Sequence, residues 1–156
     1  MYKFRQWSVT NSRRLEAVYR KFEPLLIRLH PLFKLLGYGR LEKPVRIVEK
    51  AVKGLMFDCQ MCGKCALSST GMSCPMNCPK SIRNGPCGGV RMDGHCEVIP
   101  QMRCVWVEAW RGSQQMRDNQ AIQQVQIPVN NLLKDSSSWL RVVRHEYAAH
   151  EGERIQ

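Results

Sequence analysis

The sequence predicts a small, irregular, loop-rich domain that is rich in cysteine and flanked by α-helices, mostly α with little strand. All eight cysteines lie between residues 59 and 104. Proline and glycine punctuate the same stretch densely, which favours loops and turns. Before that stretch, apolar residues recur at three and four positions, as they do on one face of a helix.

The N-terminal third is predicted to form three helices. The first carries an apolar stripe after the polar residues 10–12, which can cap a helix; its members are Leu15, Val18, Tyr19 and Phe22. A second helix is predicted to start at Pro24 and to be kinked or split at Pro31. Residues 37–39 break the pattern, and a third helix is expected over residues 44–52.

Two more helices are expected after the cysteines. One spans about residues 105–116 and carries Trp106 and Trp110. Residues 120–127 are rich in glutamine and are predicted to be extended. The serines of residues 136–138 can cap a last helix from Trp139 to about residue 150. Ordinary core packing is the favoured role of the three tryptophans in these segments.

Charge divides the chain as sharply as cysteine does. Residues 1–54 hold 13 Lys or Arg against 4 acids, so they carry +9 of the total charge of +11. We therefore divide the chain into a basic amphipathic helical extension (1–54), a cysteine-rich metal-cluster domain (55–140) and a C-terminal helix and tail (141–156). The basic helices favour docking to an acidic partner; attachment to a membrane surface is the alternative. Without a binding motif, nucleic acid is not expected.

The expected compartment is the cytoplasm. No apolar run approaches the roughly 20 residues that a membrane span needs. The opening residues MYKFRQWSVTNSRR lack the apolar region of a secretory signal. In a reducing compartment, a block of cysteines binds metal more often than it forms disulfides.

The cysteine block opens with three cysteines, each separated by two residues, as the bacterial ferredoxin pattern does. Two later cysteines precede proline, another feature of that pattern, although the gap after Cys65 is eight residues where the pattern has three. Two four-thiolate [4Fe–4S] sites are the favoured interpretation, two zinc sites the main alternative, and disulfides or free thiols the third. The candidate ligands are Cys59, Cys62, Cys65, Cys74, Cys78, Cys87, Cys96 and Cys104.

Spacing also suggests how the ligands divide. Cys59, Cys62 and Cys65 are predicted to share one cluster, with a distant fourth ligand, Cys78 or Cys104. Histidine is not needed as a ligand when eight cysteines are present. We expect His95 to be free of metal, His30 to lie on the surface, and His145 and His150 to lie on a solvated face.

The motifs resemble those of the methylenetetrahydrofolate reductase C-terminal domain family, which includes the small subunit of the two-subunit, acetogen-type reductase. The distinctive segments are CPMNCPK (74–80), RNGPCGG (83–89) and GHCEV (94–98), followed by Cys104-Val105-Trp106, Ile127-Pro128 and Ser137-Ser138-Trp139. The resemblance covers about residues 55–140 and leaves the first 54 residues outside.

The resemblance implies an iron–sulfur subunit with two [4Fe–4S] clusters on its eight cysteines, although some members are described as zinc-containing. It implies a flavin-containing TIM-barrel reductase subunit as partner, to which the clusters pass electrons, and an acidic redox protein is a possible donor. The chain itself has no G-x-G-x-x-G motif and too few residues for a barrel. We therefore expect a non-catalytic accessory subunit, with a structural zinc module as the alternative.

Overall fold

The structure is a computed structural model that describes residues 2–153, with side chains through residue 148. Its helices are α1 (Tyr2–Thr10), α2 (Ser12–Arg28), α3 (His30–Leu36), α4 (Tyr38–Phe57), α5 (Val105–Ser113) and α6 (Ser138–Glu153). Short 3₁₀ turns lie at Pro75–Asn77, Ala121–Gln123 and Asn131–Leu133. Among the described residues, strand pairing is limited to two isolated bridges, Val90 with Cys96 and His95 with Arg103. The expected mostly helical, loop-rich class is confirmed.

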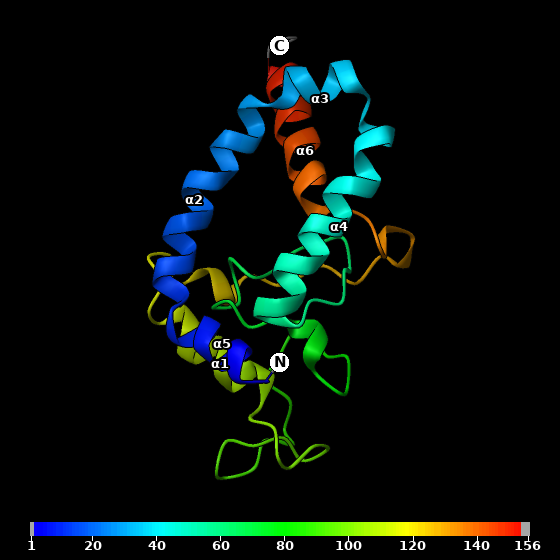
Figure 1. Cartoon of the computed structure of the whole chain (residues 1–156). Helices are drawn as coiled ribbons and strands as arrows, with labels where there is room; N and C mark the ends of the chain where they lie inside the picture. Colours follow the sequence, from blue (N-terminus) through cyan, green and yellow to red (C-terminus); the bar gives the residue numbers. More distant parts are fainter. Residues whose placement is uncertain (1, 154–156) are drawn as a thin grey trace.

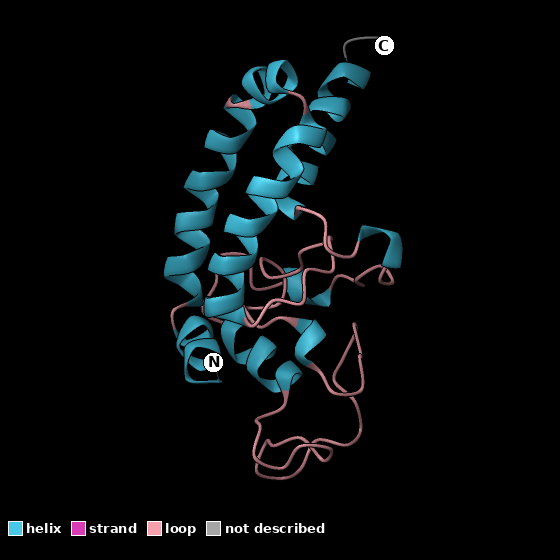
Figure 2. Ribbon diagram, turned by 45° about the vertical axis from the view of Figure 1, so that its right-hand side comes forward, coloured by secondary structure: helices cyan, strands magenta, loops and turns pink. Residues whose placement is uncertain are grey.

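The cysteine loops, residues 58–104, lie at the end of the molecule opposite α3 (Figure 1). Figure 1 shows α2, α4 and α6 standing side by side, joined at one end by α3, while α1 and α5 lie across the other end. The first part of the cysteine loops lies beside the lower ends of α4 and α6 in Figure 1, the later part extends beyond α1 and α5, and Figure 2 shows how little regular structure they contain. Because α4 ends at Phe57, its last turn leads directly into Cys59.

The N-terminal helices differ from the expected boundaries at Pro24. This residue lies inside α2, which continues to Arg28, and the break falls at Leu29. Proline has no backbone N–H, so the Arg20 carbonyl lacks its helical donor. Pro24 and Arg20 are both exposed to water. The split at Pro31 is confirmed, since Pro31 lies in the first turn of α3, where no donor is needed.

Two further expectations about the helices were wrong or incomplete. Sequence reasoning missed α1, which packs on α4 through a 2.9 Å hydrogen bond from Ser8 Oγ to the Met56 carbonyl. His30 is buried rather than on the surface, because it stacks on Tyr147 and forms a 2.6 Å hydrogen bond with the Tyr38 hydroxyl. His145 is exposed as expected, and the side chain of His150 lies outside the described residues.

The core lies beneath the cysteine loops. One cluster of buried residues joins the end of α4 to the loops and consists of Phe57, Leu67, Met72, Cys74 and Met116. A second joins Cys104 to Trp106 and Ala109 of α5. Trp110, by contrast, is 54% exposed, so the expectation that it packs in the core was wrong. None of the described helices is both long and apolar enough to cross a bilayer.

Candidate metal centre

Four of the eight cysteines line one pocket. Cys59, Cys62, Cys65 and Cys74 lie around it, together with Lys53 from α4 and Arg83 from a later loop. The first three form the predicted triplet, and the fourth cysteine of the pocket is Cys74; the two candidates for a fourth ligand, Cys78 and Cys104, do not line it. The pocket lies where α4, the cysteine loops and the start of α6 meet.

The triplet follows an abrupt change of direction at the end of α4. Asp58 adopts a left-handed conformation that ends the helix, and Met61 and Gly63 adopt left-handed conformations within the triplet. At Gly63 an added Cβ would collide with Leu133 and Ser136, so only glycine fits there. These turns bring backbone donors to sulfur: the Met61 N–H lies 3.4 Å from Cys59 Sγ.

The eight-residue gap before Cys74 forms a compact turn. The Thr70 hydroxyl donates 2.8 Å hydrogen bonds to the carbonyls of Ala66 and Ser73, which closes the turn on itself. Gly71 packs directly on the backbone of α5, where a Cβ would collide with Ala109 and Ser113. The chain therefore returns to the triplet at Cys74, which explains how the longer gap still brings four cysteines together.

Without metal, the environment of two of these thiols, Cys59 and Cys74, favours the protonated form. Burial raises the pKa of Cys59 and raises that of Cys74 to about 12, and neighbouring thiolate charge adds to both shifts. A bound cation would reverse this preference, since cysteine binds metal as the thiolate. Cys59 and Cys74 are thus poorly suited to act as free nucleophiles.

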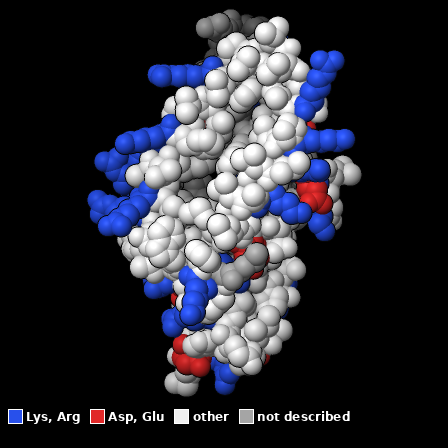
Figure 3. Space-filling model, in the orientation of Figure 1, with Lys and Arg blue, Asp and Glu red and all other residues white. Residues whose placement is uncertain are grey.

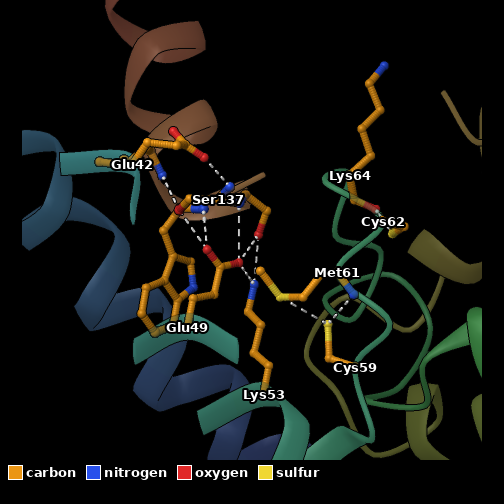
Figure 4. Close-up of polar contacts among 11 residues, drawn as sticks. Glu42, Glu49, Lys53, Cys59, Met61, Cys62, Lys64 and Ser137 are labelled. Atoms are coloured by element: carbon orange, nitrogen blue, oxygen red, sulfur yellow. Dashed lines mark hydrogen bonds and ion pairs between the residues drawn. The ribbon is translucent and has the colours of Figure 1, made fainter. Parts of the chain in front are cut away.

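A buried ion pair closes one side of the pocket. Lys53 Nζ lies 2.7 Å from Glu49 Oε1 and donates a 2.7 Å hydrogen bond to Ser138 Oγ (Figure 4). Burial alone would lower the pKa of Lys53, but the charges of Cys65 and Glu49 outweigh it and raise the pKa to about 12. Lys53 is therefore a fixed cation beside the cysteines. Sequence reasoning missed it, because a Glu–Lys pair four residues apart usually lies on a helix surface.

Arg83 provides a second cation at the same pocket. Its guanidinium lies 3.8 Å from Cys62 Sγ and is fixed by hydrogen bonds of 2.9 Å to the Lys64 carbonyl and 2.8 Å to the Ile127 carbonyl. The Lys64 side chain, in contrast, points away from the thiols (Figure 4). Charge at the pocket thus comes from Lys53 and Arg83, which lie outside the triplet, rather than from the lysine within it.

The other four cysteines lie outside this pocket. Cys87 and Cys96 lie close enough to Lys80 to help raise its pKa, although the ion pair with Glu97 is the larger cause. Cys96 pairs with Val90 in an isolated bridge, and Cys104 is buried against α5. Cys78 ends the 3₁₀ turn that follows Cys74. His95 lies 3.3 Å from Asp93, so its ring is directed to a carboxylate.

The thiols of the pocket are not gathered around a single point. Among the described residues, no three Cys, His, Asp or Glu side chains lie close enough together to hold one metal ion. A zinc ion places each thiolate about 2.3 Å from one centre. A [4Fe–4S] cluster is a larger group that takes four thiolates. Four cysteines and two cations line the pocket, a set of donors and charges that suits thiolate-bound metal of either kind.

Comparison with known proteins gives one match. A family model described as methylene-tetrahydrofolate reductase C terminal matches residues 38–132. The matched range includes α4, and with it Glu49 and Lys53, which the resemblance seen in the sequence left outside. No curated protein and no solved structure matches the chain.

Proposed function

This chain belongs to the methylene-tetrahydrofolate reductase C-terminal family, and on that premise we propose that it is the iron–sulfur electron-transfer subunit of a flavin-containing reductase. Membership supports a role in one-carbon metabolism and a partnership with a reductase of that type. The proposal adds two [4Fe–4S] clusters on the eight cysteines and a TIM-barrel partner that binds flavin and folate.

The observation that carries the proposal is the pocket of four cysteines with a buried lysine. Cys59, Cys62, Cys65 and Cys74 would bind the first cluster, which supplies one-electron transfer when it is bound. Cys78, Cys87, Cys96 and Cys104 would bind the second.

The chain's own residues would control how easily the first cluster is reduced. Thiolate-bound clusters carry negative charge, so a fixed cation nearby favours the reduced form. Lys53 and Arg83 occupy such positions. The Met61 N–H, directed at Cys59 Sγ, acts in the same direction by lowering electron density on the sulfur.

Anaerobic purification tests the proposal. We expect about eight iron and eight acid-labile sulfide per chain, with broad visible absorption that bleaches on reduction. Colourless protein with about two zinc per chain and negligible iron would instead favour a structural zinc module. We further expect no reduction of methylenetetrahydrofolate by this chain alone and recovery of that activity with its flavin-containing partner.

A further inference from the structure

An apolar face lies between α2 and α4 with no segment of the described chain packed over it. Each helix packs against α6, but the backbones of α2 and α4 do not approach each other closely. Figure 3 shows the surface between them as hollowed and largely free of charge. We call this surface the α2–α4 face and define it by Val18 and Leu25 of α2 and Val48, Val52 and Leu55 of α4.

The residues of this face form two lines along their helices. Val48, Val52 and Leu55 are spaced by four and three residues, and Val18 and Leu25 by seven, so each set follows one flank of its helix. All five are exposed, from 43% at Val52 to 64% at Val18. Monomeric proteins rarely leave large contiguous apolar patches in water, and such patches mark interaction sites.

The charges around the face are almost all positive, because three of the four acids of these helices are directed inward. Glu16 accepts a 2.8 Å hydrogen bond from the Arg117 N–H, Glu42 accepts one of 2.5 Å from the Ser137 N–H, and Glu49 is 1% exposed. The exposed bases are Arg13, Arg14, Arg20, Lys21 and Arg28 on α2 and Arg40, Lys43 and Lys50 on α4. Figure 3 shows Lys and Arg along both outer edges of the hollow.

We propose that the α2–α4 face docks an amphipathic helix of a partner protein, with its apolar stripe in the hollow and acidic residues toward the basic edges. This inference rests on the proposed partnership and names the surface on which it forms. A second copy of this chain would bring basic edges against basic edges. A bilayer surface is flat. Because this face is hollow and its bases lie on the outer edges, the apolar residues of α2 and those of α4 do not both meet a flat surface.

Binding of designed helical peptides tests the proposal on the full-length, metal-loaded protein. The probe is a peptide of about 20 residues, matching the length of α4, with a leucine stripe flanked by glutamates. The control peptide has the same stripe flanked by lysines. We expect only the acidic peptide to bind, with affinity that falls as salt is raised. Val52→Glu should weaken binding by about tenfold or more, because it places an acid in the hollow.

Leu132→Glu is the matched control, since Leu132 is 92% exposed but lies outside the face; it should bind the acidic peptide as the wild type does. If Val52→Glu fails to fold by circular dichroism, Val48→Ser replaces it. Equal binding of both peptides, or unchanged binding by the face variants, would overturn the inference. The inference would also be overturned if the protein co-sedimented with phosphatidylcholine–phosphatidylserine vesicles but did not bind the peptide. Metal content of the same preparations reports separately on the proposed clusters.

Discussion

Lys53 and Glu49 form an ion pair of 2.7 Å on one turn of α4, although both side chains are almost fully buried. The pair connects three parts of the molecule. Glu49 accepts hydrogen bonds of 2.6 Å from Ser137 and 2.5 Å from Ser138, so it fixes the start of α6. Lys53 lines the cysteine pocket. The position of α6 and the charge at the candidate metal centre therefore depend on the same two side chains.

Replacing Lys53 with methionine should lower the free energy of unfolding by about 3–5 kcal/mol, because it leaves the Glu49 carboxylate buried without its cation. Urea unfolding of the metal-loaded protein measures the effect. Lys50→Met is the matched control, since Lys50 is exposed on the same helix, and it should change stability by less than about 0.5 kcal/mol. Equal effects of the two substitutions would show that the pair does not stabilise the fold.

The contribution of Glu49 should depend on pH. Burial alone would raise its pKa, but the Lys53 charge and the serine hydrogen bonds lower it below the usual 4.5. An unfolded chain then binds the proton more tightly than the folded one, so the stabilisation is present above about pH 4.5 and is lost as pH falls below it. We expect the difference in urea midpoint between the wild type and Glu49→Gln to shrink from pH 6 to pH 3.5. A constant difference would contradict the assigned pKa.

Removing the positive charge of Arg83 should make the cluster beside Cys62 harder to reduce. Arg83→Gln is expected to lower the midpoint potential by on the order of tens of millivolts, because the oxidised cluster carries less negative charge. A redox titration followed by visible absorption measures it. Lys50→Gln should leave the potential unchanged, and a potential that moves equally in both variants would assign the effect to overall charge.

The sequence was sufficient to predict the class of fold, because helical periodicity is a local signal, and cysteine spacing, also local, was the basis for proposing eight ligands. It was insufficient to predict that Cys74 joins the triplet. That neighbourhood depends on the Thr70 hydrogen bonds and on Gly71 lying against α5, which are contacts made only after folding. In the same way, nothing local distinguishes Lys53 from the exposed lysines of α4; only the packing of Ser138 over it does.

Metal removal should unfold the cysteine loops before the helices. Residues 58–104 contain little regular structure, and their cysteines would lose the metal that connects them. The contacts of α2 and α4 with α6 join helix to helix, and Glu49 is hydrogen-bonded to Ser137 and Ser138 rather than to a cysteine. Hydrogen exchange after anaerobic chelation should show loss of protection in the loops with protection retained in α2 and α4. Equal protection of the loops before and after chelation would show that they fold without metal.

The division of the cysteines can be tested by counting iron in three single variants. Cys62→Ser and Cys74→Ser both alter the pocket shared by four cysteines, so each should remove one cluster and leave about half of the iron. Cys96→Ser alters a cysteine outside that pocket, so it should also leave about half of the iron. The cluster that remains should then be the one in the pocket. Adding Arg83→Gln to each variant distinguishes the two clusters. Its effect on the midpoint potential should persist in the Cys96→Ser variant and disappear in the Cys62→Ser variant. If Cys74→Ser instead retained the Arg83-sensitive cluster, the fourth ligand would be Cys78 or Cys104. Loss of all iron from every variant would show that the two sites fold as a single unit.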